Sequence, residues 1–194
     1  MINDKYIDEL NDIHKQPYLN YKNGLYNIGG YGSHQPALIH LLNTITKGNV
    51  MEFGMGDDST PLMHLICEKQ NRNLLSIDSD KAWFDKFTEY KSEKHKMFIF
   101  DVDKILKKEY DFFNKKYSIV FVDAAPQEIR QPFIELIKKN ADYILAHDTE
   151  QKCYSYDFSS FKYVYHFDKV RKQTSLLSNI DEIDETLIKI FKRA

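Results

Sequence analysis

The stretch NVMEFGMGDDSTPLMHLI, residues 49–66, decides how the rest of the chain is interpreted. It opens with an apolar run, passes through a Gly-Met-Gly turn at 54–56 and continues with apolar residues at helical spacing. Glycine turns between a strand and a helix usually bind phosphate through backbone N–H groups. This turn also carries the carboxylates of Glu52, Asp57 and Asp58, which repel an anion. The stretch therefore predicts a strand, a turn and a helix around a ligand that is not a simple phosphate.

The composition is that of an ordinary globular chain. It has 194 residues, of which 42% are hydrophobic and 29% charged, and a formal net charge of -2. This length suits one domain, and the charge gives no general attraction to nucleic acid or an anionic membrane. The cysteines Cys67 and Cys153 have no metal-binding spacing, which fits a reducing compartment. Because the N-terminus has no apolar leader and no run has membrane length, we expect a cytoplasmic protein.

Short apolar runs alternate with helical patterns along most of the chain. Seven runs have the length of strands, at residues 49–54, 73–78, 96–101, 117–123, 141–148, 160–168 and 172–179. Runs without strict alternation of apolar and polar residues are typical of central strands that are buried on both faces. We therefore predict an α/β fold with a doubly wound, mostly parallel sheet, and expect the last two strands to pair.

No repeat or linker composition divides the chain, so we expect one domain over residues 1–194. Residues 1–34 should hold an N-terminal helix, at 5–15, and a Tyr- and Gly-rich lid loop. Residues 35–180 should form the core, and residues 181–194 a C-terminal helix. The core helices are expected at 36–47, 59–71, 80–93, 102–114 and 127–139.

Acidic residues stand at the predicted ends of four successive strands. The second strand ends at Asp78, the third at Asp101, the fourth at Asp123 and the fifth at His147 and Asp148. The carboxyl ends of parallel strands meet at one edge of the sheet, where such proteins bind their ligands. Helix capping accounts for one or two of these aspartates. It is a weaker explanation for all four, so we expect a binding site at this edge.

Asp78 follows the first glycine of the turn at about the interval at which a carboxylate reaches a ribose in dinucleotide-binding folds. NAD(P), FAD and S-adenosylmethionine all present such a ribose. Ser59 occupies the third glycine position of the dinucleotide pattern. Pyrophosphate would be repelled by Asp57 and Asp58, whereas a sulfonium and an ammonium are attracted. Glu52, within the first strand, also suits a cationic ligand, so these features favour S-adenosylmethionine.

Five segments stand in a fixed order: VMEFGMGDDST, LLSIDSD, FIFDVD, YSIVFVDAAP and DYILAHD. Together they resemble the successive motifs of class I S-adenosylmethionine-dependent methyltransferases, over about residues 35–180. YGSHQPALIHLL, VDAAPQEIR, AHDTE and TSLLSN are similar to a group of small bacterial and viral methyltransferase-like proteins without a settled substrate. The resemblance implies a Rossmann-like methyltransferase fold, with a seven-stranded sheet whose last strand is antiparallel.

The resemblance also implies which residues bind the cofactor. The glycines of the turn would approach the methionine part, Asp78 the ribose and Asp101 with Val102 the adenine. Ser33 and His34 would reach the cofactor carboxylate. Asp58 and Ser59 stand where glycine is commoner in this turn. The full set of expected cofactor-binding residues is Ser33, His34, Glu52, Gly54, Met55, Gly56, Asp58, Ser59, Asp78, Ser79, Asp101, Val102 and Asp123.

Methyl transfer to a hydroxyl needs a positioned base as well as an aligned acceptor. His147 and Asp148, at one strand end, offer a base and an orienting acid, and Asp123 lies at the neighbouring strand end. We predict these three as catalytic residues. The alternative interpretation is that Asp148 caps a helix and His147 is a satisfied buried histidine.

Asp123 and Asp148 also match two positions that hold a divalent ion in some small-molecule O-methyltransferases. The third position is Thr149, and His147 is a poor ligand for Mg²⁺ or Ca²⁺. A metal is therefore not favoured, and no metal ligand is predicted. Asp-Ala-Ala-Pro at 123–126 lacks the Pro-Pro-aromatic tetrapeptide of enzymes that methylate base amines, which argues against a flipped-base substrate.

The predicted function is S-adenosylmethionine-dependent methylation, at oxygen, of a small-molecule or sugar-type acceptor. Two alternatives stay open: an NAD-binding oxidoreductase, and a non-catalytic binding or assembly protein with the methyltransferase fold. Nucleic acid and membrane are not expected as partners, and a homodimer is left open.

Overall fold

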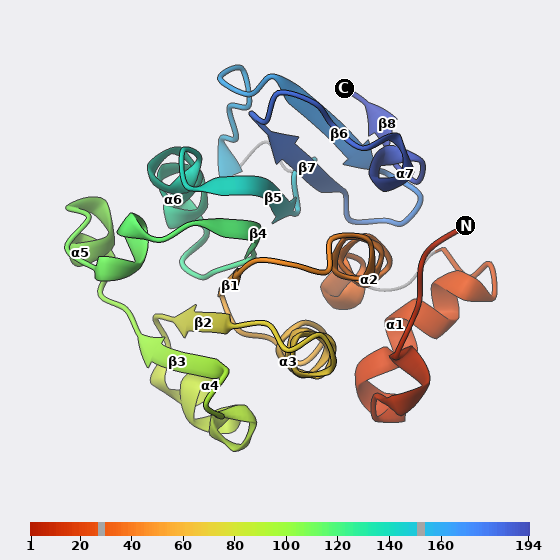
Figure 1. The fold of residues 1–194 in the computed structure, drawn as a ribbon, viewed down its shortest axis with the longest axis horizontal. Helices are drawn as coiled ribbons and strands as arrows, with labels where there is room; N and C mark the ends of the chain where they lie inside the picture. The colour runs from red at the N-terminus through yellow and green to blue at the C-terminus, as the bar shows by residue number, and fades with distance from the viewer. Residues whose placement is uncertain (27–29, 151–153) are drawn as a thin grey trace.

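A central sheet organises the computed structural model, which describes residues 1–26, 30–150 and 154–194 (Figure 1). Eight strands of this described part follow the spatial order β3-β2-β1-β4-β5-β7-β6-β8. They are β1 (Val50–Phe53), β2 (Leu74–Asp78), β3 (His95–Ile99), β4 (Tyr117–Val122), β5 (Ala141–His147), β6 (Tyr163–Phe167), β7 (Thr174–Ser178) and β8 (Lys192–Arg193). Strands β1 to β5 pair in parallel, and β7 pairs antiparallel with both β5 and β6. The predicted fold class is confirmed, with β8 added as a two-residue edge strand.

The order of the strands reverses at the junction of β1 and β4. From β1 the chain proceeds outward to β2 and β3, returns to β4 on the other side and then continues to β5. Every residue of β1 and β4 is buried, which explains why these strands are mostly apolar and do not alternate; Glu52 in β1 and Ser118 in β4 are the polar exceptions. In an open parallel sheet, the carboxyl ends of the strands on either side of such a reversal form the ligand crevice. Here Phe53 is the last residue of β1 and Val122 the last residue of β4, and the two are register partners at this crevice.

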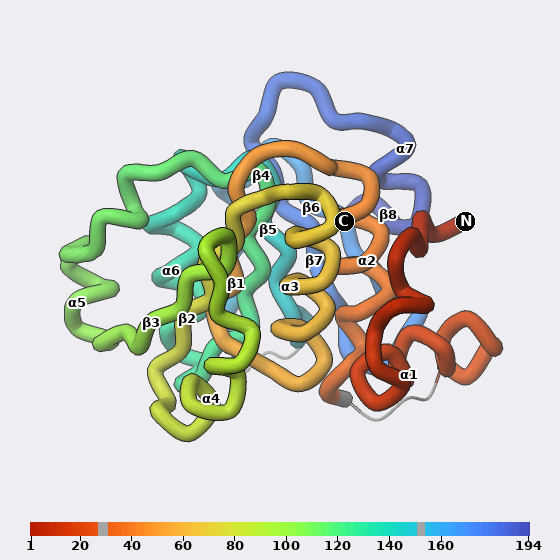
Figure 2. Tube along the Cα trace, turned by 60° about the horizontal axis from the view of Figure 1, so that its bottom comes forward, coloured from red at the N-terminus to blue at the C-terminus, as the bar shows by residue number. Residues whose placement is uncertain are grey.

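Helices cover both faces of the sheet (Figure 1). Figure 2 shows α1, α2 and α3 on one side, while α5 and α6 lie across the sheet from them. The α-helices are α1 (Asp12–Lys22), α2 (Gln35–Thr44), α3 (Thr60–Lys69), α4 (Lys81–Lys86), α5 (Val102–Leu106), α6 (Arg130–Ile137) and α7 (Glu185–Ile188). Short 3₁₀ segments are η1 (Ile7–Glu9), η2 (Gly30–Gly32), η3 (Thr88–Tyr90), η4 (Asp111–Asn114) and η5 (Gln127–Ile129). No helix of the described part is both long and apolar enough to cross a membrane.

The two ends of the chain differ from the sequence-based expectation. The first full helix begins after Asn11, whose side chain accepts a hydrogen bond from Ile13 N at 3.1 Å, and it includes Pro17. It therefore replaces part of the predicted lid loop, whose residues 27–29 lie outside the described residues. At the other end the helix expected over 181–194 is reduced to α7. It begins at an Asp184 cap, and the chain then turns into β8 against β6.

Gly54 lies where the turn leaves no room for a side chain. Gly54 has φ of 100°, and a Cβ built there would lie 2.5 Å from the Ala124 backbone. A Cβ on Gly56 would meet only the Ser59 Oγ, at 3.3 Å. Gly54→Ala should therefore lower the free energy of unfolding by about 2–5 kcal/mol, from strain plus overpacking.

Gly56→Ala is the matched control for this substitution and should cost less than about 1 kcal/mol. Urea denaturation of both variants measures the difference. Equal losses in the two would contradict the close approach of the turn to β4.

Candidate active site

The turn after β1 is fixed by the carboxylate that ends β2. The Met55 N–H donates to Asp78 Oδ2 at 2.7 Å, and the Asp80 N–H donates to Asp78 Oδ1 at 2.8 Å. Asp78 is buried, and burial raises its pKa, although these N–H groups oppose the rise. Asp78 thus has a structural task as well as its predicted ribose contact. Ser79, beside it, donates to the Ala125 carbonyl at 2.6 Å and ties this strand end to that of β4.

Glu52 is buried beneath the same turn. Its Oε1 accepts hydrogen bonds from the Ser59 hydroxyl at 2.6 Å and the Thr60 hydroxyl at 2.9 Å. Burial raises the pKa of Glu52 to about 7, against the opposing effect of these hydroxyls. Ser59 stands at the N-cap of α3, but makes no side-chain cap bond because its hydroxyl is directed to Glu52. Glu52 therefore fixes the first residues of α3 against β1, and its contact with the cofactor stays a prediction.

The two aspartates of the turn have different surroundings. Asp57 forms an ion pair with Lys86 at 2.6 Å. Asp58 is partly buried, and no hydrogen bond or ion pair to its carboxylate occurs among the described residues. Burial, and then the neighbouring Asp57, raise the pKa of Asp58. Asp58 is thus the carboxylate of the turn that has no hydrogen-bond or ion-pair partner within the described structure, although the charges of His14 and His147 act to lower its pKa.

A chain of hydrogen bonds crosses the ends of β4 and β5. His147 Nδ1 lies 3.0 Å from Asp123 Oδ2, and His147 Nε2 lies 2.8 Å from the Ser33 Oγ. Burial lowers the pKa of His147, but the Asp123 carboxylate outweighs it and raises the pKa above its ordinary value. Burial in turn raises the pKa of Asp123, and His147 with Arg130 reverses this and holds it low. Ser33, Asp123 and His147 form a continuous polar unit, which we call the histidine unit.

Two cations neutralise the carboxylates around this unit. Arg130 lies 2.8 Å from Asp123 Oδ1 and 3.5 Å from Asp148 Oδ2, and Lys172 lies 3.1 Å from Asp148 Oδ1. Arg130 also donates from Nε to the Ala124 carbonyl at 2.7 Å. These contacts use the oxygens that a Mg²⁺ ion would need, so a carboxylate site at Asp123 and Asp148 is not favoured. His147 is oriented by Asp123 rather than by Asp148, whose nearest oxygen is 3.9 Å from His147 Nε2.

His34 joins the histidine unit to the glycine turn. Its ring lies 4.8 Å from the His147 ring, centroid to centroid, and its Nε2 lies 3.4 Å from the Asp58 carbonyl oxygen. The other ring nitrogen, Nδ1, is buried and has no hydrogen-bond partner in the described part of the chain. Burial, and then the charge of His147, lower the pKa of His34 to about 3. A neutral His34 whose Nε2–H faces a carbonyl presents a lone pair at Nδ1, which does not favour its predicted contact with a cofactor carboxylate.

The end of β3 brings fewer side chains to the candidate site than the sequence predicts. Asp101 is exposed, and its Oδ1 accepts a hydrogen bond from Lys104 N at 3.1 Å, so it caps α5. Val102 follows it as the first residue of that helix. The adenine contacts of both residues stay predictions.

Sequence reasoning missed Arg130 and Lys172 and the bond between Ser33 and His147. The segment VDAAPQEIR holds Arg130 seven positions after Asp123, and this short separation was the available signal. Ser33 is 114 residues from His147, so no local pattern marks their contact.

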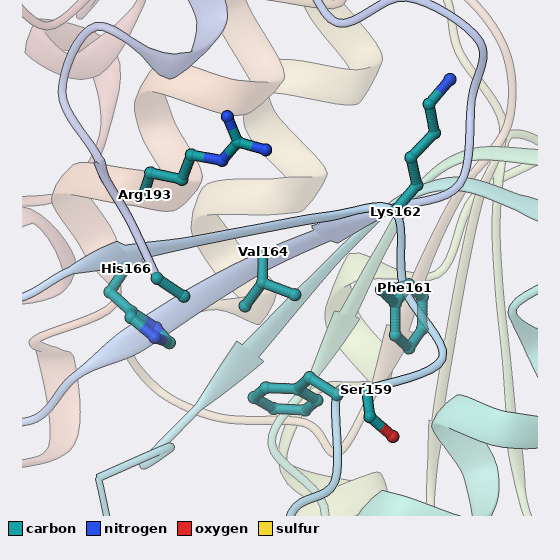
Figure 3. A pocket seen from close by; sticks show the side chains of 8 residues that line it. Ser159, Phe161, Lys162, Val164, His166 and Arg193 are labelled. Carbon is teal, nitrogen blue, oxygen red and sulfur yellow. The ribbon is translucent and has the colours of Figure 1, made fainter.

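A separate pocket of about 440 Å³ opens at the far edge of the sheet (Figure 3). Its lining includes Phe161, Lys162 and His166 near β6 and Arg193 of β8. It shares no residue with the histidine unit or with the glycine turn. The converging polar groups lie at the carboxyl ends of β1, β4 and β5, and we place the candidate site there.

Solved structures share this fold at low sequence identity. The O-methyltransferase from Bacillus cereus in complex with SAH has a TM-score of 0.58 and 10% identity, covering 90% of this chain and 96% of that one. Human methyltransferase-like protein 13 in complex with SAH has a TM-score of 0.56 and 15% identity, covering 82% and 88%. The RNA methyltransferase from Salinibacter ruber in complex with S-adenosyl-L-homocysteine has a TM-score of 0.52 and 11% identity, covering 81% and 97%. No family model and no curated protein matches the chain.

The raised pKa of Glu52 predicts a pH-dependent stability. Its folded-state pKa of about 7 exceeds its ordinary value of 4.5, so the fold favours the neutral carboxyl. The free energy of unfolding should therefore fall as pH rises from about 4.5 to about 7, by at most about 3 kcal/mol for this group.

The Glu52→Gln variant, which keeps a neutral hydrogen-bonding side chain, should lose this contribution. Urea unfolding of both proteins at pH 5 and pH 8 measures it, because the other titrating groups are common to both. The same pH dependence in both would show that Glu52 is ionised in the fold throughout.

Proposed function

We propose, for a chain with the fold of the class I S-adenosylmethionine-dependent methyltransferases, that it transfers the methyl group to an oxygen of a small-molecule acceptor. The observation that carries this proposal is the Asp123–His147 pair beside the glycine turn. Gly54 approaches the backbone of Ala124, next to Asp123, and His34 bridges from the turn to His147. A cofactor held at the turn therefore lies near a histidine that is oriented for proton transfer.

The turn suits the cofactor because of its charges. A sulfonium and an ammonium are both attracted to the Asp58 carboxylate, whereas a pyrophosphate would be repelled in this half-buried position. This observation supports S-adenosylmethionine over NAD. Gly56 carries no side chain that would block close approach of the ligand to the turn, and Asp78, already near the turn, is the proposed partner of the ribose hydroxyls.

The histidine unit supplies the proposed chemistry at the acceptor. Asp123 accepts from His147 Nδ1–H, which leaves a lone pair at Nε2 to receive a proton. Because the Ser33 hydroxyl occupies the Nε2 side, we place Ser33 between His147 and the acceptor hydroxyl. As the acceptor oxygen forms its bond to the methyl carbon, the carbon–sulfur bond breaks, the acceptor proton passes toward His147, and S-adenosylhomocysteine leaves.

Two other functions are distinguishable from this one. An NAD-dependent oxidoreductase requires a pyrophosphate at the turn, which Asp58 opposes. A non-catalytic protein with the same fold would bind the cofactor without using His147. Cofactor binding and methyl transfer to the acceptor therefore need separate measurements.

The charge of Asp58 can be tested against that of its neighbour. Asp58→Asn should weaken S-adenosylmethionine binding by about tenfold, because the cationic ligand loses an unpaired carboxylate. Asp57→Asn, which removes the same charge from a residue already paired with Lys86, should change binding less than twofold. Isothermal titration of both variants with S-adenosylmethionine and with NAD makes the comparison. Micromolar NAD binding that Asp58→Asn strengthens would support the dinucleotide alternative instead.

The acceptor step is tested with labelled methyl groups. The wild-type protein should transfer methyl from S-adenosylmethionine to members of a panel of alcohols, phenols and sugars. His147→Gln should reduce transfer about 10²–10⁴-fold, the usual contribution of a general base, while S-adenosylhomocysteine binding stays within about threefold.

His166→Gln, on β6, is the matched control and should keep full transfer. If His147→Gln does not fold, Ser33→Ala interrupts the same path. Transfer to no acceptor despite cofactor binding would leave the non-catalytic function, and transfer only to amines would overturn the choice of oxygen.

A further inference from the structure

Three potential metal ligands meet where the glycine turn reaches the histidine unit. His34, Asp123 and His147 each contribute one ligand atom, and these atoms all lie within 4.8 Å of one another. His34 stands directly before α2, Asp123 follows β4 and His147 ends β5. The sheet thus brings together side chains from three separate segments. Both histidine side chains are buried, and Asp123 is 22% exposed, so the cluster opens to solvent on the Asp123 side.

The outer atom of each of these side chains already has a partner. His34 Nε2 faces the Asp58 carbonyl oxygen at 3.4 Å, and His147 Nε2 lies 2.8 Å from the Ser33 Oγ. Asp123 Oδ1 lies 2.8 Å from Arg130. This leaves both Nδ1 atoms and Asp123 Oδ2 as inner atoms. Protein ligands of a metal ion are characteristically held in this way, with the second donor or acceptor of each ligand bonded to an outer group.

The inner nitrogen of His34 is the independent sign of a ligand. His34 is 2% exposed, and its Nδ1 has no hydrogen-bond partner within residues 1–26, 30–150 and 154–194. Leaving a buried polar atom unpaired costs about 1–3 kcal/mol, and such atoms in native folds call for an explanation. Because Nε2 faces a carbonyl oxygen, which cannot donate, Nε2 carries the proton and Nδ1 is left with a lone pair.

We propose that His34, Asp123 and His147 bind a divalent transition-metal ion through these inner atoms. A set of two imidazoles and one carboxylate suits the later first-row ions, Fe²⁺ to Zn²⁺, and not Mg²⁺ or Ca²⁺. The ion replaces the direct hydrogen bond between His147 Nδ1 and Asp123 Oδ2. This site differs from a carboxylate site at Asp123 and Asp148, because Asp148 is engaged by Arg130 and Lys172 and is not a ligand.

The charges around the cluster favour a cation. With both histidines neutral, the carboxylates of Asp58, Asp123 and Asp148 outnumber the positive charges of Arg130 and Lys172. Three protein ligands also leave at least one coordination position open on a Zn²⁺ ion. The proposal goes beyond the methyltransferase function and does not rest on it, because the cluster needs no cofactor to bind an ion.

The test measures metal binding to the full chain without cofactor. Chelator-treated protein is titrated with Zn²⁺ and with Co²⁺, and the Co²⁺ absorption spectrum reports nitrogen and oxygen coordination. We expect one ion per chain, and no binding of Mg²⁺ at the same concentrations. His34→Gln should weaken Zn²⁺ binding more than tenfold, since glutamine keeps an N–H near the Nε2 position and removes Nδ1. Its thermal unfolding curve checks that it folds.

Two control variants separate this site from others. His166→Gln removes a histidine outside the cluster and should keep Zn²⁺ affinity within about threefold. Asp148→Asn removes the carboxylate of the alternative site, and it should weaken Zn²⁺ binding less than His34→Gln does. Asp123→Asn provides a second loss-of-ligand variant should His34→Gln not fold. The proposal is overturned if Zn²⁺ and Co²⁺ do not bind, if all variants bind alike, or if only Asp148→Asn loses the ion.

Discussion

The close approach of the β1 turn to the end of β4 is the constraint on which the candidate site depends. Gly54, at a φ of 100°, lets the backbone pass where any Cβ would meet Ala124. This contact lies at the reversal of strand order, so it joins the two halves of the sheet at their ligand-binding edge. It also sets the distance from the turn to Asp123, which directly precedes Ala124. The proposed proton-transfer group and the proposed cofactor-binding turn are neighbours here because Gly54 has no side chain.

Burying a carboxylate at this edge costs free energy unless nearby donors or cations offset its charge. The chain offsets the charge of three carboxylates in different ways. Hydroxyls from Ser59 and Thr60 solvate Glu52, and backbone N–H groups solvate Asp78. Asp123 has charged partners, which hold its pKa low. Asp58 has no such compensation within the described structure, so it is the residue whose environment a cationic ligand would complete.

The sequence predicts which edge of the sheet carries the polar side chains, but not which of these side chains bond to one another. Strand ends can be predicted because short apolar runs stop at Asp78, Asp123 and His147, and parallel strands align their ends. Side-chain direction is not set by such runs. Asp101 ends a strand in the same manner, yet bonds its own helix. The bond from Ser33 to His147 depends on how the segment before α2 packs over the sheet, and no local spacing encodes that.

The position of the proton on the His34 ring decides which ligands that ring can bind. Hydrogen-bonded to a carbonyl through Nε2, a neutral imidazole offers only a lone pair at Nδ1, so it attracts a cation and not a carboxylate. His147, whose pKa is raised by Asp123, carries its proton into the same space. In the proposed site a proton and a metal ion therefore occupy this space as alternatives. A proton shared by His147 and Asp123 suits acid–base work at an acceptor, whereas an ion among the three side chains suits polarising an oxygen directly. Asp123 is common to both states, because the end of β4 places its carboxylate against His147 Nδ1.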